Sequence, residues 1–232
     1  MTHTIGSVVL ETRPRIVAAG GENDLAALAE APADMIELRA DLFAVPTPET
    51  IVAALVRLRI SGRPVLLTVR AEREGGRPLA EGQRMAIYEA GLAHVDAIDV
   101  EIASSGLVDH VVPRARAAGR TVLLSAHFPE HMPPAATLGA LIDQAFARGA
   151  DLAKLAAFAR TLDDVRTLLA VTLAARERGV VTMALGAVGT LSRVFFPAAG
   201  SLLTYGCVGQ PTAAGQLPVE ELARDLRRFY PI

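Results

Sequence analysis

The residue whose chemistry is most distinctive in this chain of 232 residues is its single lysine. The basic side chains are 22 arginines and Lys154 alone, although lysine is normally among the commonest residues. Arginine can solvate a surface or pair with a carboxylate as well as lysine can. Arginine cannot form an imine with a carbonyl compound, because a guanidinium is not a usable amine nucleophile. Lys154 is therefore the first candidate for a catalytic nucleophile.

His127 is the candidate for proton transfer. Among the five histidines, it alone falls at the end of an expected strand, and it precedes Lys154 by one strand–helix unit. The two side chains are therefore expected to meet across adjacent strands, where histidine would serve an imine-forming lysine as general acid/base. The structural alternatives are a hydrogen-bonded core histidine and a lysine that reaches the rim. No second His or Cys stands at ligand spacing, so we expect no metal site.

Charged residues also recur in stretches that should form apolar strands. Glu37 and Arg39 share one expected strand, Arg70 ends the next, and Asp99 and Glu101 share the one after. Buried charges must be paired or functional. A buried ion pair would explain any one of these strands. Five consecutive strands that end in charged or titratable groups favour a functional site.

The elements that would position these groups alternate between short apolar runs and stretches with helical periodicity, which is typical of a parallel sheet. The expected strands are 15–19, 35–41, 65–70, 97–102, 121–127, 152–158, 180–185 and 201–207. The expected helices are 22–31, 48–59, 82–93, 107–118, 135–148, 162–177, 190–197 and 219–229.

Eight strand–helix pairs predict an α/β fold of the (β/α)8 TIM-barrel type, in which active sites lie at the carboxyl ends of the strands. Residues 5–11 also alternate like a strand, and we expect a strand or hairpin there to cover the barrel floor. The alternative is an open doubly wound sheet. No glycine-rich nucleotide-binding sequence follows an early strand, which disfavours that alternative.

Length and composition limit the class of protein. A TIM barrel commonly uses about 250 residues as one unit, so we expect residues 1–232 to form a single catalytic domain. The net charge of −2 disfavours nucleic-acid binding, and no apolar run is long enough to span a membrane. Cys207 is the only cysteine and cannot form an internal disulfide. These features together predict a cytoplasmic protein.

The order of these residues resembles type I 3-dehydroquinate dehydratase, the shikimate-pathway enzyme family that works through a lysine Schiff base. The resemblance runs from about residue 15 to residue 216. The matching pieces are Glu37-Leu-Arg39-Ala-Asp41, Thr68-Val-Arg70, Glu74-Gly-Gly76, Ile98-Asp-Val-Glu101, Ser125-Ala-His127-Phe128, Asp151-Leu-Ala-Lys154-Leu-Ala156, Met183 through Ser192-Arg193, Gly200-Ser201 and Thr212-Ala-Ala-Gly-Gln216.

The resemblance implies catalytic roles for three residues. Lys154 would form an imine with the C3 ketone of 3-dehydroquinate, and His127 would move the protons. Glu101 would orient and electrostatically tune His127. A protonated imine withdraws electrons and acidifies the neighbouring C2 hydrogen, so the lysine itself supplies the electron sink and no metal or organic cofactor is expected.

The resemblance also implies a substrate-binding set and a homodimer. Arg193 would bind the substrate carboxylate, with Gln216 nearby. Thr212 and Ala213 would lie on a loop that closes over the substrate. The residues implied to hold the ring hydroxyls and shape the closed site are Glu37, Arg39 and Arg70.

Some positions depart from the family pattern, and they leave alternatives open. The family usually has Asp after the catalytic histidine, where this chain has Phe128, and Thr212 and Ala214 replace a serine and a proline of the closing loop. One alternative is another Schiff-base barrel, such as a class I aldolase acting on a different keto acid. The other is a non-catalytic binding barrel. The order of motifs disfavours the first, and the intact Lys154 and His127 disfavour the second.

Overall fold

Eight parallel strands curl into a nearly closed barrel in the computed structural model, which describes residues 2–10 and 13–230. Hydrogen bonds join neighbouring strands in the order β10-β3-β4-β5-β6-β7-β8-β9. The last gap, between β9 and β10, is bridged where Leu202 N donates to Val180 O at 2.9 Å. The predicted TIM-barrel fold is confirmed. The strands are β3 (Arg15–Gly20), β4 (Met35–Arg39), β5 (Val65–Thr68), β6 (Ala97–Glu101), β7 (Thr121–Phe128), β8 (Leu152–Phe158), β9 (Val180–Leu185) and β10 (Leu203–Cys207).

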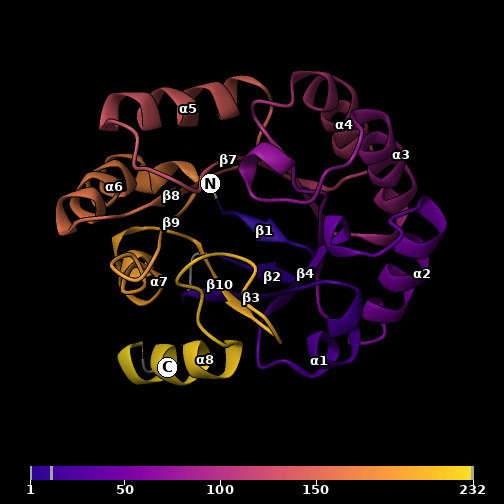
Figure 1. The fold of residues 1–232 in the computed structure, drawn as a ribbon, viewed down its shortest axis with the longest axis horizontal. Helices are drawn as coiled ribbons and strands as arrows, with labels where there is room; N and C mark the ends of the chain where they lie inside the picture. Colours follow the sequence, from indigo (N-terminus) through magenta and orange to yellow (C-terminus); the bar gives the residue numbers. More distant parts are fainter. Residues whose placement is uncertain (1, 11–12, 231–232) are drawn as a thin grey trace.

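Helices surround the barrel (Figure 1). None of the described helices is long and apolar enough to cross a membrane. The α-helices are α1 (Leu25–Glu30), α2 (Pro48–Arg59), α3 (Glu81–Gly91), α4 (Ser105–Ala117), α5 (Ala135–Ala147), α6 (Leu162–Ala175), α7 (Ser192–Phe195) and α8 (Val219–Phe229). Short 3-10 turns complete the set: η1 (Glu22–Asp24), η2 (Ala40–Leu42), η3 (Glu72–Glu74), η4 (Leu92–His94), η5 (Arg176–Arg178) and η6 (Phe196–Ala199).

Several expected elements are shorter than the sequence pattern suggested. The strand expected over 35–41 ends at Arg39, because the chain turns into η2 there. The helix expected over 190–197 is only the four residues of α7, which tightens into η6. Pro197 lies at the start of η6 and has no N–H to continue α-helical bonding.

The N-terminal segment covers the floor of the barrel as a hairpin, not as one continuous strand. Its strands β1 (Thr4–Ile5) and β2 (Val8–Val9) pair antiparallel around Gly6, whose φ of +53° is readily adopted by glycine. Ile5 and Leu10 are buried and pack into the barrel interior. Figure 1 shows the hairpin crossing the middle of the barrel. Residue 11 of the expected 5–11 strand lies outside the described residues.

The alternation of side chains along each strand places polar groups at one end of the interior. On β4, Ile36 and Leu38 pack outward in the core between barrel and helices. Met35 belongs to the interior core at the floor, and Glu37 and Arg39 follow it toward the mouth. The barrel interior is therefore filled by apolar side chains at one end, here called the apolar plug, and it opens into a charged cavity at the other.

Candidate active site

A cavity of about 240 Å³ opens at the carboxyl ends of the strands. Of the ten residues that the sequence singled out, nine line it, and only Glu101 does not. The nine are Glu37, Arg39, Arg70, His127, Lys154, Arg193, Thr212, Ala213 and Gln216. Other lining residues, which the sequence analysis did not assign to the site, include Glu74, Met183 and Tyr205.

Lys154 lies on β8, and its side chain is held among groups that favour a cation. The side chain is only 4% exposed, and Nζ lies 2.8 Å from Oδ2 of Asp99. A second carboxylate, Glu37, lies 3.6 Å away, and Nζ stands 4.1 Å from the centre of the Tyr205 ring. Two carboxylates and an aromatic face thus position the amine at the cavity wall.

His127 contacts a carboxylate that the sequence analysis did not assign to it. Oε2 of Glu74 accepts a hydrogen bond from the His127 backbone N at 2.8 Å and lies 3.0 Å from Nδ1 of the ring. Burial lowers the pKa of His127 well below its ordinary value, and the nearby cations Arg70 and Lys154 lower it further. The imidazole is therefore neutral near pH 7 and can accept a proton.

Burial also changes the pKa of the Glu74 carboxyl strongly. It raises the pKa of this carboxyl from its ordinary value of 4.5 to about 7, although the positive charge of Arg70 opposes the shift. Glu74 ends the 3-10 turn η3, so the turn after β5 brings it over the end of β7. A carboxyl that titrates near neutral pH beside a neutral histidine forms a pair able to share a proton.

Glu101 occupies a different place from the one expected. It was expected to orient His127, but the carboxylate beside that ring is Glu74. Oε1 of Glu101 accepts from Arg70 Nη1 and from the backbone N of Ala71, both at 2.9 Å. Its other oxygen pairs with Arg84. Glu101 ends β6, where the guanidinium groups of Arg70 and Arg84 lie on either side of its carboxylate.

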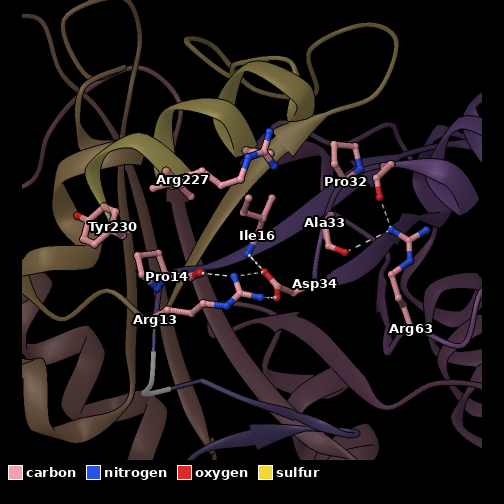
Figure 2. A pocket seen from close by; sticks show the side chains of 12 residues that line it. Arg13, Pro14, Ile16, Pro32, Ala33, Asp34, Arg63, Arg227 and Tyr230 are labelled. Atoms are coloured by element: carbon pink, nitrogen blue, oxygen red, sulfur yellow. Dashed lines mark hydrogen bonds and ion pairs between the residues drawn. The ribbon is translucent and has the colours of Figure 1, made fainter. Parts of the chain in front are cut away.

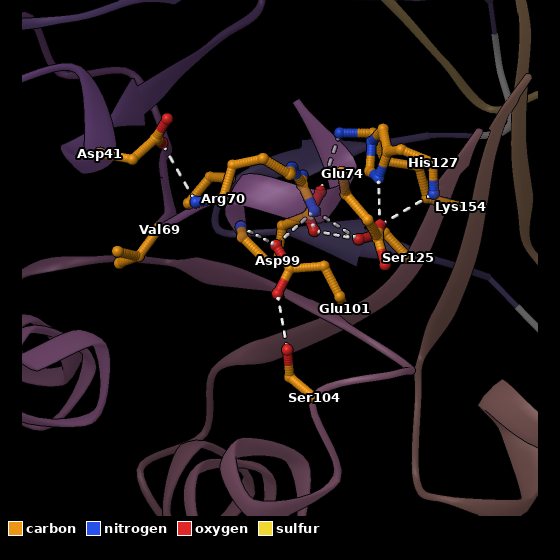
Figure 3. A network of polar contacts seen from close by, with 12 residues as sticks. Asp41, Val69, Arg70, Glu74, Asp99, Glu101, Ser104, Ser125, His127 and Lys154 are labelled. Atoms are coloured by element: carbon orange, nitrogen blue, oxygen red, sulfur yellow. Dashed lines mark hydrogen bonds and ion pairs between the residues drawn. The ribbon is translucent and has the colours of Figure 1, made fainter. Parts of the chain in front are cut away.

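Arg70 joins the buried charges behind the cavity into one network (Figure 3). Its guanidinium lies 3.0 Å from Asp99 and 2.9 Å from Glu101. It also donates to Ser125 Oγ, which in turn donates to Asp99. Burial alone would raise the pKa of Asp99, but Arg70 and Lys154 hold it well below its ordinary value. Asp99 therefore stays ionised and can keep a cation in place.

The charged residues of β4, Glu37 and Arg39, already form hydrogen bonds with neighbouring residues. Arg39 donates two hydrogen bonds to Asp41, at 2.9 and 2.8 Å, which is a bidentate ion pair. Glu37 accepts from Thr68 Oγ1 at 2.8 Å while it faces Lys154. Both Glu37 and Arg39 still border the cavity, so they can contact a ligand there.

The part of the cavity beside β9 and β10 presents a cation with a free donor. Arg193 donates through Nε to Gly215 O at 2.9 Å and through Nη1 to Tyr205 O at 3.1 Å. Its Nη2 is buried and has no hydrogen-bond partner among the described residues. Burial lowers the pKa of Arg193 to about 10, so the guanidinium stays charged near pH 7. A buried cation with an unused donor suits a carboxylate ligand.

The loop after β10 closes this side of the cavity. Thr212 donates to Oε1 of Gln216 through both its backbone N, at 2.8 Å, and its hydroxyl, at 2.9 Å. The backbone N of Gly186 donates to Ala214 O and ties the loop to the end of β9. The structure thus brings Thr212, Ala213 and Gln216 together, as the sequence predicted.

A larger cavity, of about 390 Å³, lies at the opposite end of the barrel, but its Asp34, Arg13 and Arg63 are bound by the chain itself (Figure 2). Asp34 pairs with Arg13 and Arg15. Arg63 donates to the carbonyl groups of Leu28, Ala29 and Ala31 and so caps the end of α1. Within residues 2–10 and 13–230, no group of three or more His, Cys, Asp or Glu side chains could hold a metal ion.

Comparisons with known proteins agree with this geometry. The sequence model of the family described as type I 3-dehydroquinase matches residues 18–230. The chain is 35% identical over 226 residues to a 3-dehydroquinate dehydratase of Methanococcoides burtonii, covering 95% of this chain and 96% of that protein. It is 34% identical over 235 residues to the 3-dehydroquinate dehydratase of Methanosarcina barkeri, covering 96% and 97%.

Solved structures agree as well. The crystal structure of 3-dehydroquinate dehydratase from Geobacillus kaustophilus superposes with a TM-score of 0.89 at 30% identity, covering 100% of this chain and 98% of that one. A type I 3-dehydroquinate dehydratase from Clostridium difficile, solved with covalently modified comenic acid, gives a TM-score of 0.90 at 27% identity, covering 99% and 97%. The chain therefore belongs to the type I 3-dehydroquinase family.

Proposed function

We propose that this chain is a hydro-lyase that converts 3-dehydroquinate into 3-dehydroshikimate and water through an imine on Lys154. The observation that carries the proposal is the cavity itself. Its lining includes a buried lysine, a neutral histidine and Arg193, which has an unused donor. The substrate is a small cyclic keto acid, and these groups match its ketone and its carboxylate.

The first half of the reaction makes the imine. Neutral His127 takes a proton from the Lys154 ammonium, and the free amine attacks the C3 carbonyl carbon. His127 returns that proton to the oxygen of the resulting carbinolamine and then carries a second proton from Nζ to the same oxygen, which leaves as water. The product is an iminium cation at the position that Asp99 and Glu37 hold for the ammonium. The two carboxylates therefore stabilise the positive charge in both states.

The second half removes the C1 hydroxyl. The iminium withdraws electrons from C2, and His127, again neutral, takes a proton from that carbon to leave an enamine. The enamine electrons expel the C1 hydroxyl, which leaves as water with the proton that His127 carries. Water then hydrolyses the conjugated imine, so that 3-dehydroshikimate and free Lys154 are released. Two waters leave and one enters, which gives the net loss of one.

The remaining residues bind and position the substrate in this proposal. Arg193 holds the carboxylate, and the Thr212–Gln216 loop covers it. The side chains that contact the ring hydroxyls are Glu37, Arg39 and Arg70. Glu74, and not Glu101, orients His127, because it contacts both the ring and the backbone of that residue. Neither a metal nor an organic cofactor takes part in any step.

The test is the ultraviolet absorbance of the conjugated product when EDTA-treated protein is mixed with 3-dehydroquinate. Absorbance should rise with the wild type, and it should not rise with Lys154→Ala or Lys154→Arg, since neither can form an imine. A wild type without activity would overturn the proposal. Borohydride reduction with substrate separates the alternatives, because a binding barrel gains no covalent adduct, whereas an aldolase gains an adduct but releases cleavage products.

We further infer that the enzyme is a homodimer, as the family resemblance implies, and that it is cytoplasmic, as its composition predicts. Sedimentation equilibrium of the purified protein tests the subunit number, and fractionation of the source cells tests the compartment. A monomer at micromolar concentration, or recovery outside the cytoplasmic fraction, would overturn the respective inference.

A further inference from the structure

We propose that Arg84, which lies outside the cavity, is a positioning residue that sets the charge around Lys154 through a row of buried ion pairs. This inference rests on the proposed function, because it concerns the lysine that forms the imine. Neither the motifs of the sequence nor the lining of the cavity assigns Arg84 a role.

Arg84 reaches from helix α3 toward the barrel wall and has all of its guanidinium nitrogens engaged. The residue is 3% exposed. Nε and Nη2 donate to Val69 O at 2.9 and 2.8 Å, and Nη1 donates to Ser104 Oγ at 3.2 Å. Nη2 also forms an ion pair with Glu101. Because Val69 immediately precedes Arg70, the contact with its carbonyl also fixes the backbone that carries the central cation of the network.

The ion pairs run from Arg84 to Lys154 with alternating sign, and Figure 3 labels the part of the row from Glu101 to Lys154. Glu101 divides its oxygens between two cations, with Oε2 on Arg84 and Oε1 on Arg70. Arg70 then reaches Asp99 at 3.0 Å, and Asp99 reaches Lys154 at 2.8 Å. In a buried site of low dielectric constant, each of these charges depends on its neighbours for compensation.

Replacing Arg84 by a neutral residue should therefore change the pH at which Lys154 loses its proton. Glu101 would rely on Arg70 alone, and Arg70 would compensate Asp99 less. Asp99 would then hold the Lys154 ammonium more strongly, and the whole cluster would be one charge more negative. The stronger hold of Asp99 and the more negative cluster both favour the ammonium form, so Lys154 should lose its proton only at higher pH.

The other charged and titratable side chains around Lys154 and Arg84 are still present when Arg84 is replaced. Around Lys154 they are Glu37 and Arg39 from β4, His127 from β7, Tyr205 from β10, Glu74 from η3 and Arg193 from α7. Around Arg84 they are Tyr88 from the same helix and Arg73 from η3, which shares Ser104 with it. None of these residues is itself replaced in Arg84→Gln, and Glu74, whose pKa is about 7, also titrates near neutral pH.

The experiment uses the fact that the chain has a single lysine. Protein labelled with carbon-13 at the lysine ε-carbon should give one side-chain resonance, whose pH titration reports Lys154 directly. In Arg84→Gln, we expect the midpoint to move up by about one pH unit, the order of effect that one buried charge has through a protein interior of effective dielectric constant about 20. The acid limb of kcat/KM for 3-dehydroquinate should move in the same direction.

Tyr88→Phe is the matched control, because Tyr88 ties down the same strand ends without a charge. Its hydroxyl donates to Asp99 O at 2.6 Å and accepts from Val69 N at 3.0 Å. We expect Tyr88→Phe to be less stable, with an unmoved lysine titration. An unmoved titration in folded Arg84→Gln, or an equal shift in both variants, would reduce Arg84 to a structural role and overturn the proposal.

A second comparison decides the matter if Arg84→Gln does not fold. Glu101→Gln removes the negative partner, so its lysine midpoint should lie below that of the wild type. Adding Arg84→Gln leaves no carboxylate uncompensated and should raise the midpoint again; a double variant that titrates like Glu101→Gln overturns the proposal. The titration needs no turnover, so a wild type that forms no product would overturn the proposed function without affecting this result.

Discussion

At the residue scale, the unusual group is Glu74, which is a carboxyl buried beside a histidine that is itself neutral. The side chain is 7% exposed and contacts both the ring and the backbone of His127. Its pKa of about 7 means that near neutral pH it exists in both protonation states. The protonated form can donate to Nδ1, and the ionised form can accept from it, so the pair adapts to each stage of proton transfer.

The raised pKa of Glu74 predicts a pH-dependent instability. Because the folded value of about 7 exceeds the ordinary 4.5, the native state binds more protons than the unfolded state between these values. The free energy of unfolding should therefore fall as the pH rises from about 4.5 to 7, by up to about 3 kcal/mol from this group. Glu74→Gln has no charge to bury, so urea unfolding at pH 8 should show it to be the more stable protein. Equal stability at pH 8 would contradict the burial argument.

The same variant should lose activity while it gains stability. A glutamine in place of Glu74 can hold His127 in one tautomer but cannot exchange a proton with it. We expect kcat to fall by roughly 10-fold to 100-fold, within the range of general acid–base contributions, with KM little changed. A raised KM with unchanged kcat would instead place residue 74 in substrate binding.

Residue types at strand ends predicted part of the cavity, and the family resemblance supplied Arg193, Thr212, Ala213 and Gln216. Neither predicted which side chains contact one another. A unique lysine, a histidine one strand earlier and charges at strand ends are visible in the linear sequence. The partner of His127 was missed because Glu74 lies in the turn after β5, and only the folded turn brings it over β7. Arg84 was missed because one arginine in an amphipathic helix looks like a solvated side chain until α3 is docked.

At the element scale, the loop after β10 should control substrate affinity. Gln216 holds it through two hydrogen bonds from Thr212, each contributing about 1 kcal/mol. Gln216→Ala removes both, so we expect KM for 3-dehydroquinate to rise by about 10-fold or more, with a smaller effect on kcat. Thr212→Val removes only the hydroxyl contact and should give about half the free-energy change. Steady-state kinetics of the two variants test this ranking, which equal effects would refute.

Helix ends offer a prediction that should leave the chemistry untouched. Thr161 caps α6 by accepting from Asp164 N at 3.2 Å, and Asp164 accepts from the Thr161 N at 2.9 Å. Thr161→Ala should lower the free energy of unfolding by about 1 kcal/mol, whereas Thr161→Ser keeps the cap. Urea unfolding measures the difference. A parallel loss of kcat at low denaturant would show that this cap, which does not line the cavity, is coupled to the site.

Element positions were predictable where the physical signal is local. Apolar runs and helical periodicity located the barrel strands and most helices, since both signals depend on neighbours in sequence. A strand or a hairpin was expected over residues 5–11, because alternation alone does not reveal the reversal at Gly6 that makes the segment a hairpin. The strand expected over 35–41 was too long for a related reason. A period of two residues places Arg39 and Asp41 on the same face of an extended strand. In the structure they contact each other because η2 turns the chain after Arg39.

At the scale of the whole molecule, the barrel separates stability from chemistry. Its interior is apolar at the floor, where the hairpin covers it, and charged at the mouth, where the cavity opens. The apolar plug offsets the cost of gathering so many charges at the other end, since a barrel interior filled with charges alone would have no favourable burial. Changes at the floor should therefore alter the free energy of unfolding without altering the charge network.

Ile5 allows that separation to be measured. Its side chain is 0% exposed within the interior core. Ile5→Ala should lower the free energy of unfolding by about 2–5 kcal/mol, because it leaves a cavity that the strands cannot fill. Val8→Ala, in the same hairpin but only partly buried, should cost less. Below the melting transition, both variants should keep wild-type kcat and KM. A loss of kcat in folded Ile5→Ala would mean that packing at the floor sets the strand register at the mouth, and the barrel would then act as one coupled unit.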